Sequence, residues 1–157
     1  MPYGDVSTMR SILIGLVPAA MIGASSLGAA EPVKLVQVEC NQADLVMTGT
    51  ELERAEKTST IRIVHKKGGS VGSSLFILGV SLDIAEARKC EYFVTLKEWR
   101  ADDGSWMMVE GFTNRKDADI QDEFGEQYGD QDEHGQKRRF VSVSELNRMK
   151  RAFKPEP

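Results

Sequence analysis

The chain has 157 residues, of which 24 are Asp or Glu and 20 are Lys or Arg, so its formal net charge at pH 7 is −4. This length suits one domain that is large enough to bury a core. Because the overall charge is slightly acidic, global electrostatics give no reason to expect a nucleic-acid partner.

The N-terminus has the pattern of a cleavable signal peptide. An uncharged run covers residues 12–30, follows Arg10 and ends on small residues. Such a run predicts export and cleavage after Ala30, so that residues 1–30 are removed and residues 31–157 form the mature domain. A retained membrane anchor is the alternative, although Pro18 and the small residues weaken a membrane span.

Met9 is a possible true start, because no basic residue precedes it and Met9-Arg10 would begin an ordinary signal. In either case the expected location is periplasmic or secreted. That location puts ATP, reduced pyridine nucleotides and nucleic acid largely out of reach.

The mature chain has two cysteines, Cys40 and Cys90. In an oxidising compartment an even pair without metal-ligand spacing predicts one disulfide bond between them. Two free thiols, or a bond between two chains, are the alternatives. A Cys-x-x-Cys redox motif is absent from the sequence.

The first half of the domain is rich in strand patterns. A strand is expected over residues 33–40, and residues 45–52 and 60–66 suggest a hairpin. The Gly- and Ser-rich residues 68–74 have a loop composition, and the apolar run 75–80 fits a buried strand or helix equally well. Ser81 is then expected to cap a short helix that extends to about Cys90.

The strongest local pattern is a hairpin over residues 91–114. Asp103-Gly104 suits a two-residue turn of type I′, which would place Trp99 across from Met108. In that register four side chains share one face of the hairpin and form a candidate binding surface for a protein, peptide or glycan. These are Trp99, Trp106, Met108 and Phe112. The alternative is that a helix, such as the terminal one, covers this face.

The C-terminal third divides into an acidic and a basic segment. Residues 115–136 are polar and acidic, which predicts a flexible loop. Ser142 and Glu145 match a capping box before the apolar spacing of Leu146 and Met149, so a basic helix is expected over residues 143–154. This helix could pair with the acidic loop or bind an anionic lipid surface weakly.

Two sequence patterns match a catalytic site and a calcium site incompletely. Gly68-Gly-Ser-Val-Gly72 matches a nucleophile elbow, with Ser70 as nucleophile and His65 as a possible base, but the chain lacks the repeated strand–helix units of that scaffold. Asp130 and Asp132 could begin a calcium loop, yet the twelfth position is Val141 instead of a bidentate Glu.

The sequence therefore predicts a single α+β domain with a small, mostly antiparallel sheet, one or two packed helices and one disulfide. The expected function is that of an exported, non-enzymatic binding or assembly module acting through protein contacts in the envelope or outside the cell. A small secreted hydrolase or effector and a calcium-steadied extracellular protein are the alternatives. No cofactor is predicted, and membrane contact is expected only through the uncleaved precursor or weakly through the basic helix.

Overall fold

The structure is a computed structural model that describes residues 33–152. The predicted signal peptide (residues 1–30), the possible start at Met9 and the last five residues lie outside this range.

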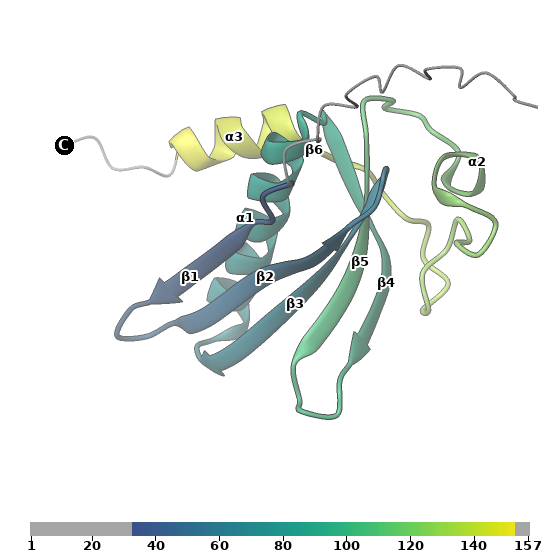
Figure 1. Ribbon diagram of the computed structural model, residues 1–157. Coiled ribbons are helices and arrows are strands. Elements are labelled where there is room, and N and C mark those ends of the chain that lie inside the picture. The colour runs from purple at the N-terminus through teal and green to yellow at the C-terminus, as the bar shows by residue number, and fades with distance from the viewer. Residues whose placement is uncertain (1–32, 153–157) are drawn as a thin grey trace, which may run out of the picture. The chain divides into compact units, whose positions relative to one another are not determined.

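Six antiparallel strands form one curled sheet in the order β1-β2-β3-β5-β4-β6 (Figure 1). The strands are β1 (Gln37–Asn41), β2 (Val46–Arg54), β3 (Thr58–Lys67), β4 (Tyr92–Arg100), β5 (Trp106–Thr113) and β6 (Val141–Ser142). The helices are α1 (Ser70–Arg88), α2 (Ile120–Phe124) and α3 (Val143–Ala152). The predicted α+β class with an antiparallel sheet is confirmed.

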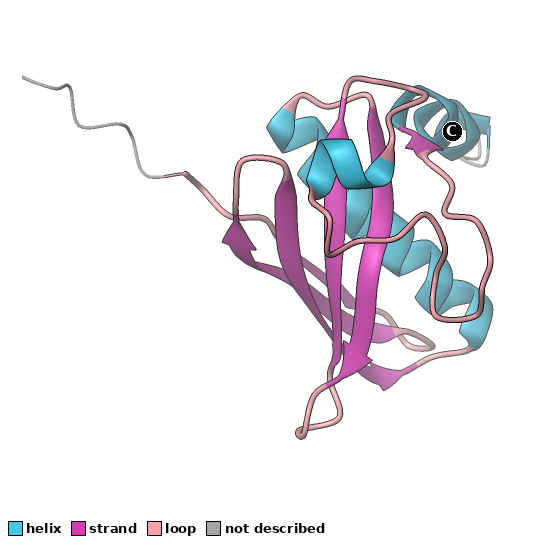
Figure 2. Cartoon of the chain, turned by 90° about the vertical axis from the view of Figure 1, so that its right-hand side faces the viewer, coloured by secondary structure: helices cyan, strands magenta, loops and turns pink. Residues whose placement is uncertain are grey.

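Helix α1 packs across one face of the sheet (Figure 2). Its Val80 and Ile84 are fully buried against Ile61 and Phe93 in the larger of two hydrophobic clusters. The approach of helix to sheet is close, because a Cβ atom on Gly49 would lie 2.5 Å from Val80 Cγ2. A side chain at Gly49 would therefore push α1 away from β2.

Helix α2 covers the other face of the sheet over β4 and β5 (Figure 2). Ile120 and Phe124 pack there against Val94 and Leu96. Gly111 makes room for them, since a Cβ atom at this position would lie 2.6 Å from the Phe124 ring. The acidic segment that was predicted as a loop thus contains a helix whose apolar side chains belong to the core.

The predicted loop over residues 68–74 and the predicted capping role of Ser81 are wrong, whereas the helix expected after Ser81 is present as the second half of α1. Helix α1 begins at Ser70, and Ser81 lies in its middle, where its Oγ donates to Glu110 Oε1 at 2.7 Å. The Ser73 and Ser74 hydroxyls bond the carbonyls of Gly69 and Ser70, one turn earlier. Packing of the helix on the sheet overrides the loop composition.

The predicted hairpin exists, but its register is wrong. Asp102, Asp103 and Gly104 form a three-residue turn, closed by a 2.9 Å bond from Ala101 N to Ser105 O, with Gly104 at a φ of 80°. Such a turn shifts the strands by one residue relative to a two-residue turn. As a result, Trp99 lies across from Met107 instead of Met108.

The predicted disulfide is also absent, and Cys40 and Cys90 are free. Cys40 Sγ lies 3.7 Å from the Leu45 carbonyl, beside the start of α1, whereas Cys90 follows the end of that helix. A helix of 19 residues spans roughly 28 Å. Disulfide-linked Cα atoms lie within about 7 Å of each other, so the two thiols cannot meet in this fold.

Candidate functional site

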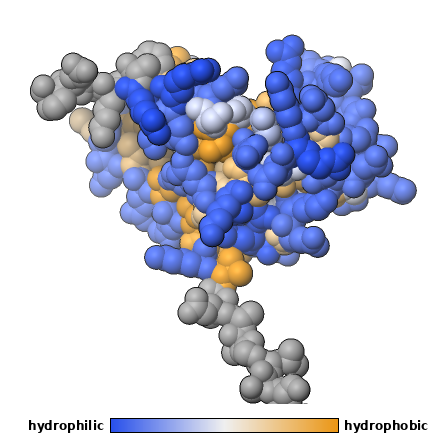
Figure 3. Space-filling model, turned by 90° about the horizontal axis from the view of Figure 1, so that it is seen from above, coloured by the Kyte–Doolittle hydropathy of each residue, from blue (hydrophilic) through white to orange (hydrophobic). Residues whose placement is uncertain are grey.

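The surface is mostly hydrophilic, and hydrophobic residues gather in a limited area of the face seen from above (Figure 3). Most large apolar side chains of the described residues are covered. The exposed ones are Val33, Leu35, Leu52, Val71, Leu75, Trp99 and Met149.

The end of the β4–β5 hairpin carries both tryptophans of the chain, on opposite faces of the sheet. Trp106 alternates with Met107 along β5 and packs partly against the α1 cluster. Trp99 pairs with Met107, so it lies on the face away from α1, and 37% of it is exposed. A β-bulge between Thr95 and Lys97 is the cause, because the extra residue exchanges the faces of the rest of β4.

A cation stacks on each tryptophan. The Arg100 guanidinium lies 5.0 Å from the centroid of the Trp106 ring, and Lys97 Nζ lies 5.3 Å from that of Trp99. Lys97 and Arg100 are themselves exposed. Stacked cations of this kind restrict the rings and leave part of each ring open to solvent.

Hydrogen bonds hold the turn of this hairpin in one conformation. The Asp103 carboxylate accepts from Ser105 N at 2.9 Å, from Ser105 Oγ at 2.6 Å and from the Arg62 guanidinium of β3. Arg100 Nη1 donates to the Gly104 carbonyl at 3.0 Å. The hydrogen bonds from Ser105, with the charge of Arg62, hold the pKa of Asp103 below its ordinary value. The turn is therefore ordered although it is exposed.

The other two residues of the predicted binding surface lie elsewhere. Met108 and Phe112 are 3% and 2% exposed and belong to the core under α1. The tilted pair of Phe112 and Phe93 rings, 6.3 Å apart, lies in the same core. The four predicted residues thus do not form one exposed face, and only Trp99 and Trp106 reach the surface at the hairpin end.

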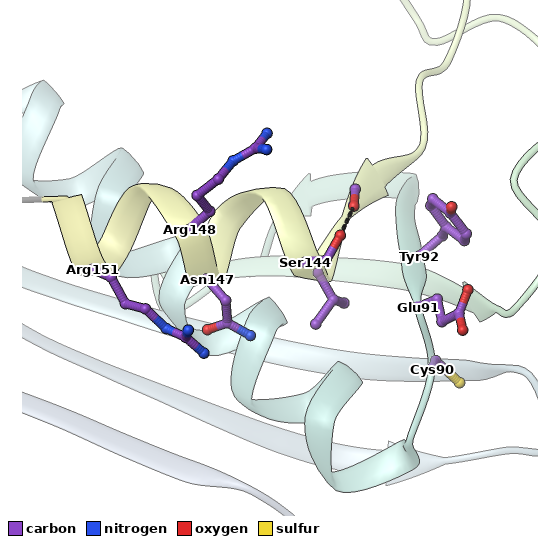
Figure 4. A pocket seen from close by; sticks show the side chains of 9 residues that line it. Cys90, Glu91, Tyr92, Ser144, Asn147, Arg148 and Arg151 are labelled. Carbon is purple, nitrogen blue, oxygen red and sulfur yellow. Dashed lines mark hydrogen bonds between the residues drawn. The ribbon is translucent and has the colours of Figure 1, made fainter.

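An open groove of about 720 Å³ separates α3 from the start of β4 (Figure 4). Cys90 and Tyr92 line one side, and Asn147 and Arg151 line the other. Burial raises the pKa of the Cys90 thiol, which keeps it protonated, and the Asn147 amide is held by Glu86 Oε1 at 2.7 Å. A protonated thiol is a poor nucleophile, so this groove offers no evident covalent chemistry.

A second groove, of about 780 Å³, lies between β4 and residues 132–141. It is lined by charged side chains of both signs, among them Glu98, His134 and Arg138. Arg138 Nη1 donates to the Thr95 carbonyl at 2.7 Å and thereby ties the segment to the exposed edge of β4. This segment lies along the part of the β4 edge that β6 does not pair with.

The predicted catalytic and metal residues are not arranged for chemistry. Ser70 is the exposed first residue of α1, and within residues 33–152 its hydroxyl has no hydrogen-bonded base, while His65 is exposed near the end of β3. Asp132 Oδ1 accepts from the backbone amides of His134 and Gln136, as expected of a turn. Within the described range, no three His, Cys, Asp or Glu side chains are grouped to hold a metal ion.

Two buried carboxylates were not predicted from the sequence. Glu110, 1% exposed, bonds Ser81 between β5 and α1, and Glu51, also 1% exposed, bonds Arg54 and Ser59. The signal for Glu110 was present, because it alternates with Met108 and Phe112 along one face of a strand. These two groups belong to the interior and not to a surface site.

No protein-family model, no curated protein and no solved structure matches this chain.

Proposed function

We propose that the chain is an exported binding or assembly module that acts through protein contacts at the end of the β4–β5 hairpin. The observation that carries the proposal is the pair of partly exposed tryptophans at the hairpin end, one on each face of the sheet, each stacked by a cation and close to a turn held by Asp103. Export rests on the signal-peptide pattern of residues 1–30.

The composition of the hairpin end supports a protein partner. Trp and Arg are the residues most enriched among those that dominate binding energy at protein interfaces. All three residue positions Trp99, Arg100 and Trp106 lie at one end of the hairpin, with Arg100 and Trp106 on one face of the sheet and Trp99 on the other. Because the turn is already ordered by hydrogen bonds, a partner would not have to offset the conformational entropy of a mobile loop.

The proposal is tested by placing a photo-crosslinking phenylalanine analogue at position 99 in the full chain, expressed in cells. A specific adduct is expected at this position and is not expected when the same analogue replaces Leu52. Leu52 is a suitable control because it is 46% exposed on β2, away from the hairpin end.

Binding of the captured partner is then measured with Trp99→Ala and Leu52→Ala. Loss of an interfacial tryptophan should weaken binding by roughly 30-fold, with little change in the melting temperature, since Trp99 is partly exposed. Equal losses for the two variants, or adducts at position 52 alone, would exclude the hairpin end as the binding site.

A further inference from the structure

Helix α1 presents an apolar stripe on its outer side. Val71, Leu75, Leu78 and Leu82 follow one another at helical spacing, so they lie on one side of the helix. Leu82 is 3% exposed, whereas Val71 is 73% and Leu75 is 64% exposed. The stripe is therefore covered at its C-terminal end and open over its first two turns.

Helix α3 is the element that covers the C-terminal end of the stripe. Its Asn147 bonds Glu86, and its Leu146 packs against the α1 cluster. No other described element packs on the outer side of α1 at Val71 and Leu75. A Cβ atom on Gly79, between these two regions, would meet open space. The open part of the stripe is thus convex and has no opposing wall.

By length and composition alone, α1 could also cross a membrane. Its inner side excludes that role in this fold, because Val80 and Ile84 lie in the core and Ser81 bonds the buried Glu110. The helix is a core helix with one uncovered apolar end.

Cations lie at both ends of this stripe. Lys66 is exposed at the end of β3, just before α1 begins, and Arg148 and Arg151 are exposed on α3. Within residues 33–152 none of these three side chains forms an ion pair. Arg148 points away from α1, toward solvent (Figure 4).

We propose that the outer side of α1, together with α3, docks on an anionic phospholipid surface. Protruding aliphatic side chains next to basic residues are what interfacial membrane binding requires. A second copy fits less well, because a two-fold contact through this stripe would bring the same cations of both copies together. A helical peptide partner would prefer a groove, and the open stripe is convex.

This docking goes beyond the proposed protein contacts and does not depend on them. Trp99 lies on the face of the sheet opposite α1, so the chain could contact a membrane and a protein at the same time.

The test places an environment-sensitive nitrobenzoxadiazole label in the full chain through Leu75→Cys, with Cys40 and Cys90 replaced by Ser. A label at Leu52→Cys is the matched control, because that side chain is exposed on β2. With vesicles containing phosphatidylglycerol, emission from position 75 should increase and shift to the blue, whereas pure phosphatidylcholine vesicles should have little effect. The local label reports docking of α1 even if residues 1–30 also contact the vesicle.

A second measurement keeps both cysteines and uses vesicle sedimentation of the chain starting at Glu31, provided that its melting curve shows a cooperative fold. Leu75→Glu and the double change Arg148→Gln, Arg151→Gln should each reduce binding by at least about tenfold, and about 0.5 M salt should do the same for the parent chain. Leu52→Glu should change binding by less than about twofold.

Several outcomes would overturn the proposal. They are an absent response at position 75, an equal response at position 52, or binding to neutral and anionic vesicles alike. A blue shift that grows with protein concentration without lipid would identify a second copy as the occupant. A shift with an acidic protein but not with vesicles would identify a protein partner instead. Neither of the last two results would affect the test at Trp99.

Discussion

Two buried carboxylates on different strands of the sheet, Glu51 and Glu110, have pKa values shifted in opposite directions, because their hydrogen-bond partners differ. Burial raises the pKa of Glu51, but hydrogen bonds from Arg54, Ser59 and the Val36 amide outweigh burial and hold it below the ordinary value. Glu110 has one partner, Ser81, and its Oε2 has none among the described residues. Burial, with a smaller contribution from the charge of Glu98, raises the pKa of Glu110 to about 7.

Replacing Glu110 with Gln should make the protein more stable than the parent at pH 8 and leave the two similar at pH 4. In the unfolded chain Glu110 ionises near its ordinary pKa of 4.5, whereas in the fold it stays protonated until about 7. The parent therefore loses stability as the pH rises through this window, whereas the amide side chain of the variant does not ionise. The expected difference at pH 8 is about 3 kcal/mol by linkage.

Urea denaturation of both proteins from pH 4 to 8 measures this difference. The groups that face Glu110 include the uncharged Ser81 of α1, Ser59 of β3 and Thr95 of β4, together with the charged Glu98 of β4, and all of them are unchanged in the variant. A constant offset between the two proteins across the pH range would show that Glu110 ionises alike in the folded and unfolded states. Glu51→Gln is a contrasting variant, expected to destabilise by about 3 kcal/mol because Arg54 loses its buried partner.

At the scale of elements, local signals were sufficient for some segments and not for others. The β2–β3 hairpin and the start of α3 are confirmed, and Ser142 Oγ accepts from Glu145 N as a capping residue does. The first half of helix α1 was missed because its first turns are rich in Gly and Ser, and the packing of Phe76 and Ile77 against the core cluster supports the helix there. Long-range packing of this kind leaves no local pattern in the sequence.

The faces of the hairpin were not predicted, for a similar reason. Alternation along the strands assigned Trp99 and Trp106 to one face, whereas the structure places them on opposite faces of the sheet. Leu96 alternates with Val94 and packs with Ile120 and Phe124, which lie far along the chain, and the bulge at this point changes the faces of the residues from Lys97 onward. Because the contact of Leu96 with α2 helps to decide where β4 forms its bulge, the sequences of β4 and β5 alone could not show which side chains lie on which face of the hairpin.

The contact between α1 and the sheet depends on Gly49, and Gly49→Ala should destabilise the fold by about 1–3 kcal/mol. The added methyl group would lie 2.5 Å from Val80 Cγ2 and 3.3 Å from Ile63 Cδ1, so helix or strand must move. Gly79→Ala on the outer side of α1 is the matched control. Its methyl group meets open space, and the variant should gain roughly 0.5–1 kcal/mol from helix propensity.

Thermal unfolding followed by circular dichroism measures both variants. A Gly49→Ala protein as stable as the parent would mean that α1 does not approach β2 as closely as the structure describes. A destabilised Gly79→Ala protein would mean that the outer side of α1 is covered, which would also weaken the proposed membrane docking.

At the scale of the whole molecule, the state of the two cysteines depends on where the ends of α1 lie. Composition and the expected compartment favour a disulfide, since an exported chain with two cysteines commonly pairs them. The fold places one thiol beside the start of a 19-residue helix and the other after its end. The two cysteines are therefore too far apart to pair, although the expected oxidising compartment favours a disulfide. The spacing of the cysteines along the sequence could not have shown this distance.

Both thiols of the mature protein, purified without reductant, should react with iodoacetamide in guanidinium. Two alkyl groups should be added, at Cys40 and Cys90, because neither thiol is paired in the structure. Without denaturant Cys90 should react slowly, since burial raises the pKa of its thiol and leaves little thiolate. If no alkyl group is added and the mass is two hydrogens lower, Cys40 and Cys90 form a disulfide. That bond would require a fold in which β1 meets the end of α1. The same mass spectrum reads the N-terminus, so a chain starting at Glu31 would support the proposed export independently of the thiol result.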